Sequence, residues 1–211
     1  SPARVPPAVA GTPSHANSLP RIATTGSALR SRVSGNMVAA LTGFVARAKK
    51  TGKIYAALYE LADEELVSSL EHLGKKLEIV LSNSAVTDAK TKKKLDGNAA
   101  SRLRIGKTAA HEWNRIMPSN HIGHNKFLVY VDAKGKAQAV LFGSTNWTST
   151  GLCAQTNNTV VVEDSALANR YWGYWKQLSA DTKAAKGVAK ALQAAALRTW
   201  DSPSKQFSVH R

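Results

Sequence analysis

The sequence contains little cysteine and no long apolar run. Its single cysteine, Cys153, excludes an internal disulfide framework and any metal cluster built on cysteine ligands. No apolar segment approaches the ~18 residues of a membrane span, and the first residues lack the basic start and apolar centre of an intact signal peptide. These absences predict a soluble chain, cytoplasmic or secreted, and they leave the compartment open.

Acidic residues are also scarce. The 211 residues include 29 Lys and Arg against 14 Asp and Glu, so the formal net charge is +15. Such an excess raises the rate of encounter with polyanions, including nucleic acid and anionic lipid surfaces. The hydrophobic content of 43% suffices for a substantial core. The composition therefore favours a globular protein with a phosphate-rich partner.

The two ends of the chain differ in composition from its centre. Residues 1–34 are rich in Pro, Gly, Ser, Thr and Ala without a sustained apolar period, which predicts an extended arm or linker. Residues 35–180 carry the periodic apolar patterns of one domain. Residues 181–211 begin with an Ala- and Lys-rich helix over 181–198 and end in a loop-like tail. We expect this last part to be an extension, or a linker to a second half absent from this sequence.

Strand and helix patterns alternate at the start of the central region. The segment "NMVAALTGFVARAKKTG" predicts a helix, "KIYAALYEL" and "KKLEIVLSN" predict strands, and "DEELVSSLEHLG" between them predicts a short capped helix. Strand, helix and strand with short connections favour a parallel pair joined by a right-handed crossover. The expected fold class is α/β, a mixed and largely parallel β-sheet flanked by helices.

The rest of the central region is less uniform. Residues 83–122 predict a long functional loop with a short strand near "SRLRIG", and its basic run "KTKKK" suits a solvated loop or contact with a phosphate backbone. The segments "KFLVYVD" and "AQAVLFG" predict a β-hairpin, and "NTVVVED" predicts another strand. The aromatic residues of "SALANRYWGYWKQLSA" fit the core-facing side of a helix rather than a base-stacking surface.

Two groups of polar residues lie next to the predicted hairpin. His124 and Lys126 are two positions apart at the head of its first strand, so their side chains point the same way. Ser144, Thr145 and Asn146 follow its second strand, where small residues allow backbone amides to approach a ligand closely. The hairpin can bring both groups to one anion, and the donors suit a phosphate.

The residues "HNK…GSTN" resemble the signature of the phospholipase D superfamily, and the resemblance extends over roughly residues 36–180. It implies a phosphodiesterase in which a histidine forms a covalent phosphohistidine while a second histidine protonates the leaving oxygen, without metal or cofactor. By this resemblance His124, Lys126 and Asn146 are catalytic. We expect the groups that contact the substrate or fix the histidine to be Ser144, Thr145, Asn157 and His111.

Two positions depart from the family pattern. The pattern has an acid five residues after the lysine, whereas this chain has Val131 there and Asp132 one step later. Either a β-bulge corrects the shift or Asp132 is only a turn residue, and we expect no catalytic role for it. Where many relatives carry an acid that orients the histidine, this chain has Asn157 and Asn158, so an amide is the candidate for that task.

The chain carries one HxK motif, and the resemblance implies that an active site needs two. The second copy comes either from a homodimer partner or from a missing second half. A zinc site made of His111, His121 and His124 is a weaker alternative, because no acid or cysteine stands at compact spacing beside them. We therefore expect no bound metal.

Three functions agree with these features. The first is a metal-independent endonuclease, because a charge of +15 suits a long polyanion better than one lipid headgroup. The second is a phospholipase D-type lipid hydrolase or transferase, which requires an apolar or interfacial surface. The third is a catalytically incomplete half that only binds nucleic acid. The sequence leaves open whether a nucleic-acid substrate is DNA or RNA.

Overall fold

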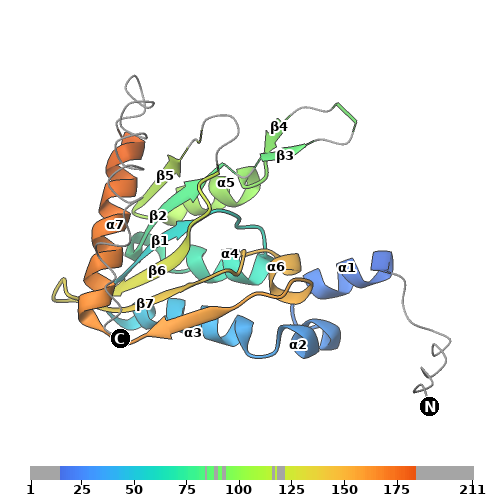
Figure 1. The fold of residues 1–211 in the computed structure, drawn as a ribbon, viewed down its shortest axis with the longest axis horizontal. Coiled ribbons are helices and arrows are strands. Elements are labelled where there is room, and N and C mark those ends of the chain that lie inside the picture. Colours follow the sequence, from blue (N-terminus) through green and yellow to red (C-terminus); the bar gives the residue numbers. More distant parts are fainter. Residues whose placement is uncertain are drawn as a thin grey trace, which may run out of the picture.

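A six-stranded β-sheet with the strand order β5-β2-β1-β6-β7-β8 organises the protein (Figure 1). The structure, a computed structural model, describes residues 15–83, 85–87, 90–91, 94–115, 117 and 122–183. The six strands of this sheet are β1 (Lys53–Leu58), β2 (Leu77–Ser82), β5 (His111–Arg115), β6 (Lys126–Val131), β7 (Ala137–Gly143) and β8 (Thr159–Val162).

The strand directions confirm a mixed α/β sheet. β1 pairs with β2 and β2 with β5 in parallel, while β6, β7 and β8 join by antiparallel pairing. Because β7 is antiparallel to β6, which is itself antiparallel to β1, four strands (β1, β2, β5 and β7) point the same way. Their carboxyl ends lie on one side of the sheet, and β6 begins on that side. We call this side, which is formed by strand ends and not by an outer strand, the leading edge, and the opposite side the far edge.

Helices cover both faces of the sheet (Figure 1). Alternation along the strands sorts the apolar residues: Leu128 of β6 packs with α3 (Met37–Lys50) and α4 (Glu64–Glu71), whereas Phe127 and Val129 pack with α7 (Ser165–Lys183). The remaining elements are α1 (His15–Ala23), α2 (Ala28–Ser34), the 3₁₀ turn η1 (Gly74–Lys76), β3 (Ala85–Thr87), β4 (Lys94–Asp96), α5 (Ala99–Thr108) and α6 (Ser149–Cys153).

The predicted crossover and hairpin are both present. β1, α4 and β2 form the expected parallel unit, and α4 begins at Asp63, whose carboxylate accepts a hydrogen bond from the backbone N–H of Leu66 at 3.3 Å. β6 and β7 form the antiparallel hairpin, and β8 is the next strand beside β7. The helices predicted before β1 and after β8 are α3 and α7.

Asp132 organises the turn between β6 and β7. Its Oδ1 accepts hydrogen bonds from the backbone N–H groups of Lys134 and Lys136, both at 2.9 Å, and its Oδ2 accepts one from Gln138 Nε2 at 2.8 Å. A β-bulge is present, but its extra residue is Gln138 on β7, so the bulge does not turn Asp132 toward the leading edge. Asp132 is therefore a turn residue at the far end of β6.

The prediction of an extended arm over residues 1–34 is wrong for the part that the structure describes. Residues 15–34 contain α1 and α2, and Ile22 is buried in the domain. The sequence shows no apolar period here because Arg30 and Ser34, both polar, are the buried residues of α2. Arg30 forms a buried ion pair with Asp63 at 2.7 Å, which an apolar pattern does not reveal.

The short strand predicted near "SRLRIG" is also wrong, since these residues belong to α5. The alternation of Leu103 and Ile105 with arginines imitates a strand, yet only Ile105 enters the core and Leu103 is 70% exposed. Arg104 instead bonds to glutamates of α4. Residues 92 and 93 of the basic run at 90–94 lie outside the described residues, as does the part of the helix predicted over 181–198 that follows the end of α7 at Lys183.

Candidate active site

The two groups of polar residues meet at the leading edge. The ladder between β6 and β7 ends where Phe127 lies opposite Phe142. The residues before Phe127 and those after Phe142 therefore emerge from neighbouring strands about 5 Å apart. One group contains His124 and Lys126 and the other contains the "GSTN" residues 143–146, so the predicted arrangement around the hairpin is present.

Lys126 is buried at this edge. It is 7% exposed and lies opposite Leu58, the last residue of β1. Its Nζ lies 5.2 Å from the centroid of the Tyr59 ring and donates to the carbonyl of His124 at 3.4 Å. Burial lowers the pKa of Lys126 to about 8, and Glu60 acts in the opposite direction. The ammonium is therefore charged at neutral pH but costly to keep away from water.

His124 packs against the same tyrosine. The centroids of its ring and the Tyr59 ring are 4.7 Å apart, and the ring planes meet at 60°. Burial lowers the pKa of His124, the charge of Lys126 lowers it further, and Glu60 raises it. The imidazole is consequently neutral at pH 7, which is the form that can attack an electrophile.

Asn146 lies in the loop that follows β7. Its Oδ1 is buried and has no hydrogen-bond partner among the residues that the structure describes. The next residue, Trp147, is 1% exposed and forms a bridge with Leu61, so the backbone beside Asn146 is fixed. A buried polar atom without a partner is costly in the free protein and is a common feature of ligand sites.

Ser144 is held by the segment before β8. Its Oγ accepts a hydrogen bond from the backbone N–H of Asn158 at 3.0 Å, and its own N–H donates to the carbonyl of Asn158 at 3.1 Å. The side chain remains exposed. A hydroxyl that accepts from the backbone still has its own proton to donate, so Ser144 can bind an anion while it stays anchored.

Three predicted site residues have other partners. Thr145 is 2% exposed, and its hydroxyl donates to the carbonyl of Asn158 at 2.8 Å, on the side of the loop that faces the core. Asn157 donates to the carbonyl of Gly151 at 2.8 Å, which fixes the end of α6. The expected contact of Asn157 with the histidine is therefore not present.

His111 is the third of these residues, and it lies at the opposite edge of the sheet. It is the first residue of β5, pairs in register with Glu78 and bonds to that carboxylate at 2.9 Å. Since β5 runs toward the leading edge, its first residue lies away from it. The prediction that His111 lines the site is wrong, because the irregular segment before β6 contains a strand that the sequence did not indicate.

The structure adds two residues that sequence reasoning missed, Tyr59 and Asn98. Tyr59 directly follows β1, and its ring contacts both His124 and Lys126. Asn98, 1% exposed, donates to the carbonyls of Tyr59 and Ser82 at 2.7 and 2.8 Å and accepts from the N–H of Leu61 at 2.9 Å. It therefore ties together the ends of β1 and β2. The position of Tyr59 after a strand at the leading edge was a usable signal, whereas Asn98 had none.

Gly123 determines how the chain enters the site. A Cβ atom at this position would lie 2.7 Å from the Oγ of the buried Ser82 and 3.4 Å from Met117. A larger residue here would force the Ser82 side chain to move, and His124 is the next residue along the chain. The placement of His124 therefore depends on contact between the loop and the end of β2.

No group of three or more His, Cys, Asp or Glu residues that could hold a metal occurs within the described ranges. His121 of the weaker zinc alternative lies outside those ranges. None of the described helices is both long enough and apolar enough to cross a membrane.

A family model described as "Cardiolipin synthase, PLD-like domain" matches residues 43–179, which include β1 to β8 and most of α7. The chain belongs to the phospholipase D superfamily. The match includes His124, Lys126 and the "GSTN" residues 143–146, and it begins after α1 and α2. No curated protein sequence matches the chain significantly.

Two solved structures share this fold with TM-scores of at least 0.50, and a third is similar at a slightly lower score. The family member Nuc from Salmonella typhimurium has a TM-score of 0.51 and 17% identity, over 68% of this chain and 86% of that one. Polyphosphate kinase from Porphyromonas gingivalis has a TM-score of 0.50 and 14% identity, over 82% of this chain but only 27% of the kinase. NucT from Helicobacter pylori has a TM-score of 0.49 and 10% identity, over 69% and 88%.

Proposed function

We propose that the chain is a metal-independent phosphodiesterase that hydrolyses nucleic acid through a covalent phosphohistidine. The observation that carries this proposal is that His124 and Lys126 both contact the ring of Tyr59, at the side of the sheet where the loop that contains Ser144 and Asn146 follows β7. A neutral imidazole, a buried cation and two uncharged donors are the groups that a phosphodiester requires.

The reaction has two steps. In the first, an imidazole nitrogen of His124 attacks phosphorus, a P–N bond forms, and the bond to the leaving oxygen breaks as a second histidine gives that oxygen a proton. In the second, this histidine takes a proton from water, the water oxygen attacks phosphorus, and the P–N bond breaks. Lys126 and the Asn146 amide hold the non-bridging oxygens, and Ser144 fixes the phosphate from the rim of the site.

The second histidine is His124 of another copy of the chain, or an equivalent residue on sequence absent here. Two copies with their leading edges opposed across a twofold axis bring two HxK motifs to one phosphate. Molar mass in solution tests this requirement. A dimer with activity supports the homodimer, and an active strict monomer contradicts the need for a second motif.

The net charge of +15 supports nucleic acid over lipid as the substrate. We expect the protein to cut plasmid DNA or RNA in the presence of EDTA, with affinity that falls steeply as salt rises. Phosphatidylcholine vesicles are the comparison substrate. Hydrolysis of the vesicles but not of nucleic acid supports the phospholipase alternative, and binding of nucleic acid without cleavage supports the incomplete half.

Trapping a phosphohistidine gives the direct test of the chemistry. Protein denatured rapidly at neutral to alkaline pH, where the P–N bond survives, should carry a covalent substrate–phosphoryl adduct on His124 during turnover, and the His124→Ala variant should carry none. Hydrolysis that is unchanged in His124→Ala contradicts the proposed mechanism.

A further inference from the structure

A buried ion pair connects α2 to the catalytic domain. Arg30 donates from Nη1 to Asp63 Oδ2 at 2.7 Å and from Nη2 to Asp63 Oδ1 at 2.8 Å. The side chains are 3% and 1% exposed. Two parallel N–H···O bonds fix distance and orientation together, so this contact defines where α2 sits relative to Asp63.

Asp63 in turn holds the loop that carries Asn146. The Oγ of Ser149 donates to Asp63 Oδ2 at 2.8 Å. The backbone N–H groups of Ala62 and Asp63 donate to the carbonyl of Trp147 at 2.9 and 3.0 Å. The loop is thus bonded on both sides of Trp147 to the segment that follows β1.

Asn146 has little freedom within this arrangement. The N–H of Trp147 donates to the carbonyl of Glu60 at 3.2 Å. The carbonyl of Asn146 lies so close to Gly151 that a side chain at position 151 would overlap it. A displacement of Asp63 should therefore also displace the backbone of Asn146, because hydrogen bonds and close backbone contacts join the two.

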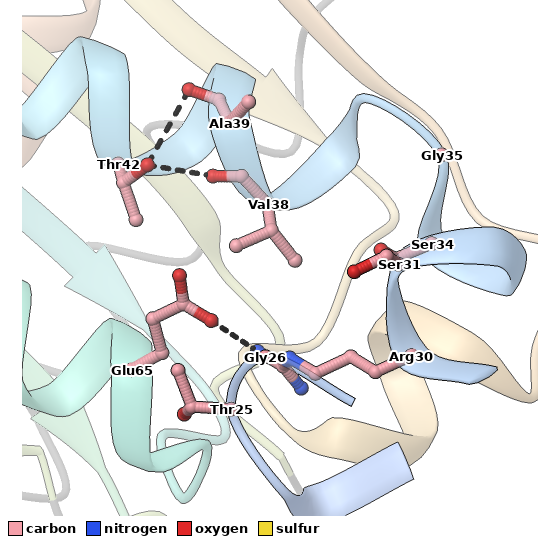
Figure 2. A pocket seen from close by; sticks show the side chains of 10 residues that line it. All are labelled: Thr25, Gly26, Arg30, Ser31, Ser34, Gly35, Val38, Ala39, Thr42 and Glu65. Atoms are coloured by element: carbon pink, nitrogen blue, oxygen red, sulfur yellow. Dashed lines mark hydrogen bonds and ion pairs between the residues drawn. The ribbon is translucent and has the colours of Figure 1, made fainter. Parts of the chain in front are cut away.

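Arg30 is the buried side chain through which α2 bonds to the start of α4. Arg30 and Ser34 are the buried residues of α2. Arg30 is one of the residues that line a cavity of about 420 Å³ between α2, α3 and α4, and Glu65 of α4 accepts a further bond from Nη2 at 3.1 Å (Figure 2). Removal of the guanidinium fork thus removes the bonds that α2 makes to Asp63 and Glu65.

We propose that Arg30 is a positioning residue for Asn146, acting through Asp63 and Ser149. Residues 15–34 lie before the matched family segment 43–179, so in this proposal α2 acts on the geometry of the catalytic loop from outside that segment. The inference about turnover rests on the proposed phosphodiesterase function. The inference about the loop geometry does not.

The test uses four variants of the full chain. Arg30→Met removes the fork, and Arg30→Lys keeps the charge without bidentate geometry. Arg30→Met/Asp63→Asn removes both charges. This double variant is included because a buried Asp63 carboxylate without its partner is strongly destabilising in Arg30→Met. Arg32→Met, on an exposed position of the same helix, is the matched control. Amide hydrogen exchange of residues 144–149 and the steady-state parameters of hydrolysis are measured for each.

We expect exchange of residues 144–149 to rise at least about tenfold in folded Arg30→Met or in the double variant, with β1 and β2 unchanged. We expect kcat to fall by about 100-fold with KM within about twofold, and Arg30→Lys to be intermediate. Arg32→Met should match the wild type. Exchange that stays unchanged at 144–149, or rises equally across the sheet, overturns the proposal. If the wild-type protein shows no hydrolysis that depends on His124, the proposed function is wrong. The hydrogen-exchange result then still decides whether Arg30 positions the loop.

Discussion

The two edges of the sheet each carry a histidine and a lysine, and the burial of the lysine differs between them. At the leading edge, His124 packs on Tyr59 and Lys126 is 7% exposed, and burial lowers the pKa of both groups. At the far edge, the His111 and Lys53 side chains are 59% and 45% exposed and contact the carboxylate of Glu78 at 2.9 and 3.7 Å.

The difference separates a structural cluster from a reactive one. At the far edge the Glu78 carboxylate contacts both the His111 imidazole and the Lys53 ammonium, so the lysine charge has a counter-ion within the protein. At the leading edge, desolvation acts on two neighbouring basic groups and raises the free energy of their charged forms. An incoming phosphate compensates for that cost, which is why perturbed groups of this kind gather at functional sites.

The largest expected contrast is between the two histidines. His124→Ala should lower kcat/KM for phosphodiester hydrolysis by about 10³-fold or more, because the nucleophile is lost. His111→Ala should stay within about twofold of the wild type, since its partner Glu78 belongs to the far edge. Steady-state hydrolysis of an oligonucleotide in EDTA measures both. Equal losses in the two variants would contradict the assignment of the site to the leading edge.

The second contrast is between the two lysines. Burial lowers the pKa of Lys126 from 10.5 to about 8, so between these values the unfolded chain binds more protons than the folded one. The free energy of unfolding should therefore rise from pH 8 to 10.5, by about 3 kcal/mol at most. Lys126→Met should lack this component of the rise.

Urea unfolding at a series of pH values measures this effect. Lys53→Met is the matched control, because Lys53 is 45% exposed and should leave the rise in place. The idea fails if wild type and Lys126→Met have the same pH dependence above pH 8.

The smallest effect is expected at the turn of the far edge. Backbone N–H bonds, mainly that of Lys136, hold the pKa of Asp132 below its ordinary value of 3.8. Its contribution is therefore present above that value and lost as the pH falls through the lower, folded-state pKa. Asp132→Asn should lose less stability than wild type on acidification and keep full hydrolysis. A drop in hydrolysis would show that Asp132 has a catalytic role after all.

Sequence reasoning could place His124, Lys126 and the "GSTN" loop because their relation is local. A hairpin determines which strand ends are neighbours, and alternation determines which side chains share a face. The crossover unit around α4 is predictable for the same reason, since short connections leave few arrangements.

The missed features depend on contacts that are distant in the sequence. Asn98 acts on Tyr59 and Leu61, almost forty residues earlier. Arg30 holds α2 through Asp63, and a single charged residue carries no periodic signal. The motif gave a wrong expectation for Thr145. Its side chain is buried, and its hydroxyl donates to the carbonyl of Asn158 instead of facing a ligand. His111 was misplaced because β5 has no apolar pattern.

The two outermost strands differ in a way that matters for handling the protein. β5 presents the charged and aromatic sequence "HEWNR", whereas β8 is the four-residue "TVVV" with Val160 and Val161 exposed at 45% and 37%. Charged side chains discourage strand addition, and an exposed apolar edge invites it. Self-association by pairing of outer strands should therefore start at β8. The short length of β8, and the charges of Glu163 and Asp164 directly after it, should limit this pairing.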